Sequence, residues 1–254
     1  MRFSIAGDTR RNTHYADKPN EDLFWFELEL GTAMVLDGVT RDREDGRYPN
    51  PSPARLACEA FAGAASAALF RSSAEMAPSE RLLLAVQAGN AAVAHANAGF
   101  PSAFLPGTVG VLALVCGSAL HYAYVGDCNG LLIAGGRVSY FTVPQTAEVH
   151  RRKHEFTTHE IRTQICNNAS HACGYGVWNG QAEAADFLRC GTVPLAAGDR
   201  VLLCTDGLEP FLASLPAEEL AALSGETLLA RAMAFEKAEG WMDDRTAVLI
   251  TALD

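Results

Sequence analysis

The stretch Val201-Leu202-Leu203-Cys204-Thr205-Asp206-Gly207 joins an apolar run to an aspartate at the point where a strand should end. A similar junction occurs at 34–38 and 123–127, and at 243–250 the acids precede the apolar run. An unpaired carboxylate costs several kcal/mol to bury, so acids that recur at the ends of core strands need a cation to gather around. The pattern therefore predicts a hard-metal site built from oxygen ligands.

Composition and charge exclude several classes of protein. The chain has 254 residues, of which 49% are hydrophobic, and this is enough for the core of one large domain. A net charge of -10 opposes binding to nucleic acid or to an anionic membrane surface. No apolar run approaches the roughly 20 residues that cross a bilayer, and the first residues do not resemble a secretory signal, so we expect a cytoplasmic protein. Seven scattered cysteines fit a reducing compartment better than a disulfide framework.

The hydrophobic pattern predicts an antiparallel sheet sandwich with helices packed outside. Apolar-rich runs at 22–29 and 32–37 predict a hairpin that brings Glu21 and Asp37 to the same end. Two alanine-rich segments with helical spacing, 53–71 and 78–98, should form an antiparallel pair. Hairpins and helix pairs, rather than alternating βαβ units, indicate the α+β kind of α/β fold. Further strands are expected at 107–115, 119–125, 130–133, 137–141, 200–204 and 247–253, and further helices at 216–223 and 227–239.

Four acids that lie far apart in the sequence are each adjacent to a predicted strand, so sheet formation can bring them to one edge. They are Glu21, Asp37, Asp206 and Asp243. Oxygen ligands without histidine or cysteine favour Mg²⁺ or Mn²⁺ over zinc. A carboxylate that bridges two such ions about 3.5–4 Å apart creates the two-metal arrangement used in phosphoester displacement. The acids therefore point to phosphoester chemistry.

Six short motifs occur in an order that resembles the metal-dependent protein phosphatase family (PPM type, protein phosphatase 2C-like) in its bacterial single-domain form. Each motif alone is weak, but together they extend from residue 20 to residue 246. The motifs are Asn20-Glu21-Asp22, Leu36-Asp37-Gly38, Gly107-Thr108, Val125-Gly126-Asp127-Cys128, Leu203-Cys204-Thr205-Asp206-Gly207-Leu208 and Asp243-Asp244-Arg245-Thr246.

The resemblance implies one PPM-type phosphatase domain over residues 1–254, an α-β-β-α sandwich with two mostly antiparallel sheets flanked by helix pairs. It also implies hydrolysis of phosphoserine or phosphothreonine by a metal-activated water, with a phosphorylated protein as substrate and a cognate Ser/Thr kinase as partner. Asp37, Asp206 and Asp243 would act through that water.

The ligand set is carried over from the same resemblance. Asp37 would bridge two ions, Gly38 (through its carbonyl) and Glu21 would complete one site, and Asp206 and Asp243 would hold the other. Asp127, with Asp206, would recruit a third and weaker ion. Asp22 would accept a hydrogen bond from metal-bound water.

The chain departs from the family at two catalytic positions. The arginine that grips substrate phosphate, four residues before the motif glutamate, is replaced by Asp17. Lys18, Arg10 or Arg11 could supply the positive charge, although lysine lacks the bidentate fork of arginine. The histidine that follows the Asp-Gly motif in many relatives is also missing, since Val39-Thr40-Arg41-Asp42-Arg43 stands there. Metal-bound water or another residue would then protonate the leaving group.

The polar stretch 142–191 corresponds to the variable flap of the family, which borders the substrate groove. It contains a His/Cys cluster whose spacing matches no standard zinc pattern. Its basic run, 151–153, could meet an acidic or phosphorylated partner or form a solvated face. The histidines and cysteines of this cluster are His150, His154, His159, His171, Cys166 and Cys173.

Two alternatives stand beside the protein phosphatase hypothesis. A catalytically silent relative would use the same sandwich as a scaffold or a phosphate-sensing module, and the missing arginine supports it. An enzyme that hydrolyses a small phosphorylated metabolite would need the same fold and metals. Silent relatives usually lose metal-binding acids, whereas this chain keeps them all, so the sequence favours the enzyme.

Overall fold

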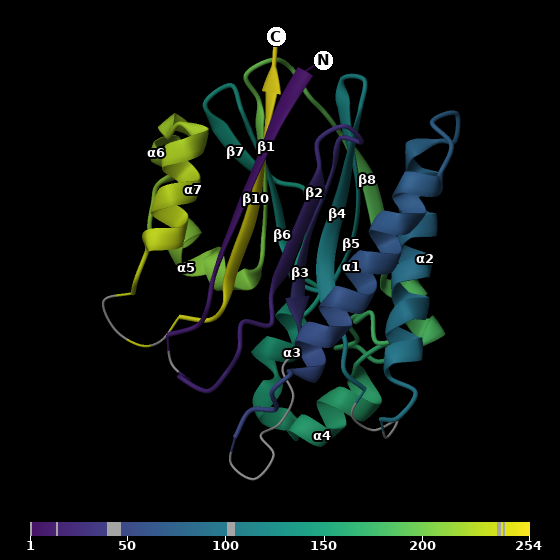
Figure 1. Cartoon of the computed structure of the whole chain (residues 1–254). Helices are drawn as coiled ribbons and strands as arrows, with labels where there is room; N and C mark the ends of the chain where they lie inside the picture. The colour runs from purple at the N-terminus through teal and green to yellow at the C-terminus, as the bar shows by residue number, and fades with distance from the viewer. Residues whose placement is uncertain (1, 14, 40–46, 101–104, 238–239, 241) are drawn as a thin grey trace.

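Two five-stranded sheets, with every neighbouring pair of strands antiparallel, form the centre of the protein (Figure 1). The structure is a computed structural model that describes residues 2–13, 15–39, 47–100, 105–237, 240 and 242–254. One sheet has the order β1-β10-β9-β6-β7, formed by Arg2–Arg10, Arg245–Leu253, Arg200–Cys204, Asn129–Ala134 and Arg137–Tyr140. The other has the order β2-β3-β4-β5-β8, formed by Leu23–Glu27, Thr32–Gly38, Thr108–Cys116, Ala119–Val125 and Arg189–Pro194.

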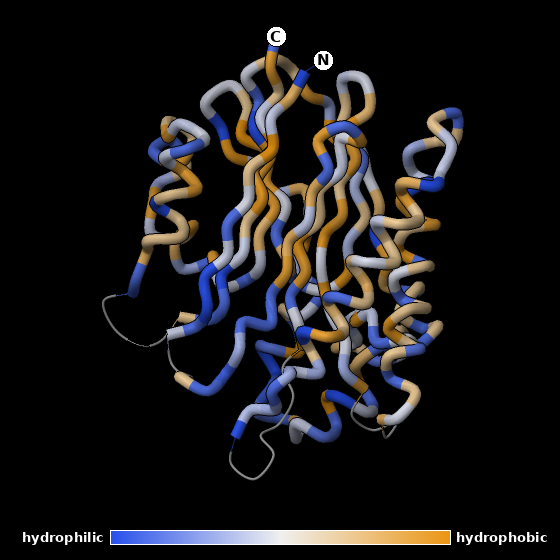
Figure 2. Tube along the Cα trace, in the orientation of Figure 1, coloured by the Kyte–Doolittle hydropathy of each residue, from blue (hydrophilic) through white to orange (hydrophobic). Residues whose placement is uncertain are grey.

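Alternating side chains of each strand serve two different apolar layers. In β3, Ala33 and Val35 pack between the sheets with Leu203 of the other sheet, whereas Met34 and Leu36 face the helices. Because successive side chains point to opposite faces of a strand, a strand that is covered on both faces is apolar throughout. The hydropathy colours show this concentration of apolar residues along the strands (Figure 2).

Helices cover the outer face of each sheet, so the expected α-β-β-α layering is confirmed (Figure 1). The pair α1 (Pro53–Arg71) and α2 (Pro78–Ala96) lies on the sheet that contains β3. Its core centres on Phe61, whose ring stacks on Trp178 with a centroid distance of 4.4 Å. Gly89 leaves room for that ring, since a Cβ there would lie 2.6 Å from it. The other sheet is covered by α5 (Glu209–Ala213), α6 (Ala217–Ala222) and α7 (Gly225–Ala234).

The flap is more ordered than its sequence indicates. Short helical segments replace the expected irregular chain, and the last flap residues belong to β8, which the sequence analysis missed. The strand β1 was also missed, because exposed and partly buried residues alternate along most of it and its sequence lacks a continuous apolar run. The final helix ends at Ala234 and not at 239. The flap segments are α3 (Ala147–Arg151), the 3-10 turns Lys153–Glu155 and Ala182–Phe187, α4 (Thr158–Glu160) and the π turn Ile161–Ile165.

Within the described residues, no helix has both the length and the apolar composition that crossing a membrane requires.

Candidate metal centre

Strand register brings four aspartates to the same end of the two sheets, opposite the end where the chain termini lie (Figure 1). Asp37 lies at the end of β3 and pairs with Val109 of β4. Asp127 follows β5, Asp206 follows β9 and Asp243 precedes β10. The apolar runs quoted above are thus the strands that carry these acids to one place.

The four aspartates line one cavity of 340 Å³, together with Gly38. All four side chains are half-buried. The flap also contributes to the lining, through Thr146, Val149, His150, Lys153, Ile161, Tyr175 and Val177. A cavity whose lining combines converging acids with apolar side chains is a suitable place for a ligand.

Burial and like charges disfavour ionisation of these acids. Burial is the main cause that raises the pKa of Asp37, and the charged neighbours that raise it further are all carboxylates, including Asp206, Asp127 and Asp243. Burial, with Asp127 and Asp243, raises the pKa of Asp206 to about 7. The cavity therefore holds more negative charge than the protein itself neutralises.

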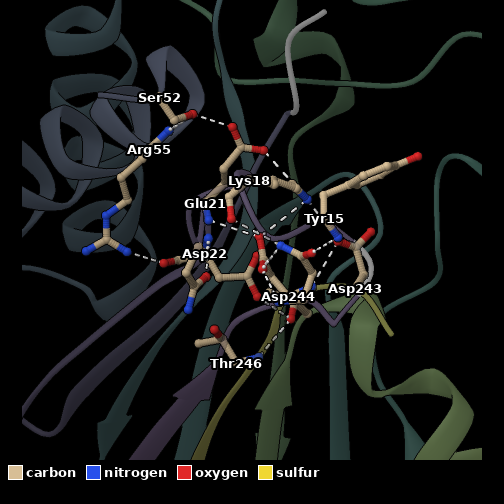
Figure 3. A network of polar contacts seen from close by, with 12 residues as sticks. Tyr15, Lys18, Glu21, Asp22, Ser52, Arg55, Asp243, Asp244 and Thr246 are labelled. Atoms are coloured by element: carbon tan, nitrogen blue, oxygen red, sulfur yellow. Dashed lines mark hydrogen bonds and ion pairs between the residues drawn. The ribbon is translucent and has the colours of Figure 1, made fainter. Parts of the chain in front are cut away.

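Lys18 is a buried cation among Glu21, Asp243 and Asp244, with 8% of its side chain exposed (Figure 3). Its Nζ lies 2.9 Å from the carboxylate of Asp243, 3.4 Å from that of Asp244 and 3.7 Å from that of Glu21. Burial alone lowers the pKa of the ammonium, but Asp244, Asp243 and Glu21 outweigh it and raise that pKa above its usual range. Lys18 is thus a permanent counter-ion for the buried acids.

The motif residues Glu21 and Asp22 are both buried and held by hydroxyl groups. The hydroxyl of Ser52, which also caps α1, donates to the Glu21 carboxylate. The hydroxyl of Thr205 donates to Asp22 over 2.8 Å. Burial, followed by the charge of Asp244, raises the pKa of Asp22 well above its usual range.

Two glycines allow the strand ends to approach one another. A Cβ at Gly38 would lie 2.8 Å from the carbonyl oxygen of Glu21, and one at Gly207 would lie 1.9 Å from the carbonyl oxygen of Asp244. The hydroxyl of Thr108 donates to the Asp37 carbonyl over 2.8 Å, which fixes the backbone at the end of β3.

The residues expected to bind phosphate have different surroundings. Lys18 contacts carboxylates, and the exposed Arg10 forms an ion pair with Asp8 at 3.4 Å. Arg11 is exposed and does not line the cavity. The segment 40–43, where relatives carry a histidine, lies outside the described residues.

Sequence reasoning missed the anchors of the flap. The hydroxyl of Thr146 donates to Asp127 over 2.8 Å, and the side-chain oxygen of Gln145 accepts from the backbone N–H of Gly126 over 3.0 Å. Only the position of Thr146, just before a short helix, could have indicated its role. These bonds tie the flap to the acidic end of the sheets.

The donor chemistry of the cavity fits divalent cations, although its acids are engaged with other partners in this arrangement. Carboxylates that crowd together without a matching positive charge are the ligands that Mg²⁺ and Mn²⁺ prefer. In the part of the chain that the structure describes, no three His, Cys, Asp or Glu side chains are already gathered around one point. Asp243 contacts Lys18 and Asp127 contacts Thr146, so cations would have to draw the acids inward. The same observation gives no support to zinc in the flap.

Comparison with known proteins agrees with this geometry. The family model for protein phosphatase 2C matches residues 11–247. A structure of the serine/threonine phosphatase PstP/Ppp from Mycobacterium tuberculosis is similar, with a TM-score of 0.69 and 21% identity over 100% of both chains. The catalytic domain of PstP in complex with two manganese ions has a TM-score of 0.67 and 21% sequence identity, over 99% of each chain.

Two further structures share the fold. PppA from Pseudomonas aeruginosa, described as a key regulatory component of T6SS, gives a TM-score of 0.66 and 17% identity over 100% of this chain and 99% of that one. RsbX in complex with magnesium has a TM-score of 0.60 and 12% sequence identity, over 98% of this chain and 94% of that one. A search of curated proteins by sequence finds no match.

Proposed function

This chain belongs to the protein phosphatase 2C family, which makes it a phosphoprotein phosphatase, and we propose that it hydrolyses phosphoserine and phosphothreonine with divalent cations in the acidic cavity. The observation that carries the proposal is the convergence of Asp37, Asp127, Asp206 and Asp243 from four strand ends on one cavity. Cations bound in this cavity would neutralise carboxylates that otherwise repel one another.

We propose the following ligand set. Asp37 would contribute to two cation sites, with the Gly38 carbonyl and Glu21 completing one of them and Asp206 and Asp243 completing the other. Asp127 and Asp206 would bind a third and weaker cation. When bound, these cations would lower the pKa of a water molecule between them and neutralise phosphoryl oxygens. The manganese and magnesium complexes among the similar structures support either ion.

The other residues of the site position these acids. Thr108 fixes the backbone of Asp37, and Thr205 holds Asp22 where it could accept a hydrogen bond from a water of the cation shell. Lys18 neutralises part of the charge beside Asp243. These contacts would hold the ligands in place before the substrate arrives.

The proposed partner is a phosphorylated protein, made by a cognate Ser/Thr kinase. Fold and metals are compatible with a small phosphorylated metabolite as well, so the substrate must be tested directly.

Hydrolysis of p-nitrophenyl phosphate, with and without Mn²⁺, tests the proposal. We expect turnover in wild type with Mn²⁺, none in excess chelator and none in Asp206→Ala. Asp199→Ala is the matched control, because the carboxylate of Asp199 accepts from the backbone N–H of Ala196 in a turn and does not line the cavity. Full activity in chelator would refute the metal mechanism, and turnover in neither protein would favour a silent scaffold. Phosphoserine and phosphothreonine peptides, compared with sugar phosphates by kcat/KM, then define the substrate class.

A further inference from the structure

The flap side of the cavity carries a lysine and a histidine. Lys153, in the 3-10 turn after α3, and His150, at the end of α3, line the same cavity as Asp37 and Asp206. Both side chains are exposed. The bond from Thr146 to Asp127 anchors the residue just before α3 beside one of the acids. The flap therefore brings a positive charge to the cavity that the acids line.

Among the described residues, two members of the basic run 151–153 form ion pairs within the flap, and the third does not. Arg151 forms an ion pair with Glu148 at 2.6 Å, and Arg152 forms one with Glu155 at 2.6 Å. Lys153 forms no ion pair with any of the described residues and lines the cavity. Of the described residues that line this cavity, Lys153 alone carries a permanent positive charge.

The N-terminal segment does not provide this charge. Asp17 stands where relatives have arginine. Lys18, its neighbour, is buried against three carboxylates, and removing it from them would leave those charges unpaired. A phosphate in the cavity would thus find its protein cation on the flap.

We propose that Lys153, with His150 beside it, binds the substrate phosphate from the flap side and takes the place of the missing arginine. The inference rests on the proposed function, because it assumes that a phosphomonoester enters this cavity. A phosphomonoester brings a charge of about -2 to a cavity that four aspartates already line, so a lysine on the flap side would help the cations to offset that charge. Lys153 supplies one positive charge and three N–H donors, and the His150 ring supplies at least one N–H donor.

Binding of inorganic phosphate to the Mn²⁺-loaded protein, measured by calorimetry, tests the proposal without requiring turnover. We expect Lys153→Met to weaken phosphate binding about tenfold, as the loss of an exposed charge-assisted hydrogen bond would. Lys153→Arg should keep affinity within about threefold, because it keeps the charge. Arg151→Met removes the same charge from the same flap, but one already paired with Glu148, and should bind as wild type. The KM for p-nitrophenyl phosphate should rise with the dissociation constant, with little change in kcat.

Lys237 provides the rival explanation. It lines a neighbouring cavity of 390 Å³ that shares Asp206 and Asp243 with the first. Loss of phosphate binding in Lys237→Met, with Lys153→Met unchanged, would overturn the proposal, and so would a wild type that binds no phosphate. Wild-type turnover with an unchanged Lys153→Met would overturn this inference and leave the phosphatase function standing. Binding that depends on Lys153 in a protein that hydrolyses no phosphomonoester would support the phosphate site and refute the proposed function.

Discussion

Asp206→Asn tests whether ionised carboxylates in the acidic cavity destabilise the metal-free protein. Burial, with the neighbouring carboxylates, raises the pKa of Asp206 from 3.8 to about 7. The folded state therefore keeps a proton that the unfolded state has released. Stability falls as the pH rises from about 4 to about 7, and the loss is complete above pH 7, because stability increases with pH only where the unfolded state holds more protons. Asparagine removes that ionisation while keeping the shape.

The size of this loss in stability follows from the difference between the two pKa values of Asp206. From 3.8 to about 7, at about 1.4 kcal/mol for each pH unit, ionised Asp206 costs at most roughly 4 kcal/mol in the metal-free protein at pH 8. The amide must still be desolvated, so we expect Asp206→Asn to gain about 2 kcal/mol at pH 8 and almost nothing at pH 4.5. In wild type, Mn²⁺ at 100 times its dissociation constant should add about 2.7 kcal/mol, and the variant should lose most of that gain.

Urea unfolding, followed by circular dichroism in chelator and in Mn²⁺ at both pH values, measures these differences. Asp199→Asn is the control, since it removes a partly exposed carboxylate from a turn and should respond to neither pH nor Mn²⁺ differently from wild type. If Asp206→Asn is no more stable than wild type in chelator at pH 8, or if Mn²⁺ stabilises both equally, the reasoning about trapped charge is wrong.

Three other substitutions probe the scaffold of the site. Lys18→Met should lower the free energy of unfolding in chelator by about 3–5 kcal/mol, because it leaves buried carboxylates without a counter-ion. Urea unfolding should show the same loss from pH 5 to pH 9, since the raised pKa of Lys18 keeps it charged throughout. A loss below about 1 kcal/mol would contradict the counter-ion role. Gly207→Ala would put a Cβ 1.9 Å from the carbonyl oxygen of Asp244, so kcat/KM for p-nitrophenyl phosphate should fall at least about tenfold, whereas Gly63→Ala, in open space on α1, should leave activity intact and raise stability by up to about 1 kcal/mol. Ser52→Ala removes both a helix cap and the partner of a buried glutamate, and thermal unfolding should show a loss of about 1–2 kcal/mol; an unchanged Tm would exclude both roles.

The elements that the sequence predicted well are those with a strong local signal. Ser52 and the proline after it mark the start of α1, and Ser52 does cap that helix. The run 200–204 is apolar because β9 is covered on both faces, and its bounds were predicted correctly. By contrast, β8 has one buried residue, Val193, so its sequence carries little hydrophobic signal. The short flap helices have too few turns to show a period.

The gathering of acids at one edge was predictable, whereas their detailed partners were not. Asp37, Asp206 and Asp243 each adjoin an apolar run, and antiparallel pairing brings such junctions together. The hydrogen-bond partner of Lys18, Asp243, however, lies 225 residues away in the sequence. The residues near Lys18 in the sequence do not indicate that its side chain is buried. Whether a lysine near an acidic motif faces solvent or replaces a cation is decided by tertiary packing, and local patterns cannot reveal it.

The acids at this end of the sandwich form two layers that are neutralised differently. The buried layer, Glu21 and Asp244, has Lys18 as its counter-ion. The layer facing the cavity contacts that lysine only through Asp243, and the charged neighbours that shift the pKa of Asp37 are carboxylates. Among the described residues, a buried lysine thus neutralises the inner layer, whereas the outer layer, near the exposed Lys153, depends more on cations from solution. Because protons and metal ions compete for the same oxygens, Mn²⁺ should stabilise the fold more at pH 8 than at pH 5.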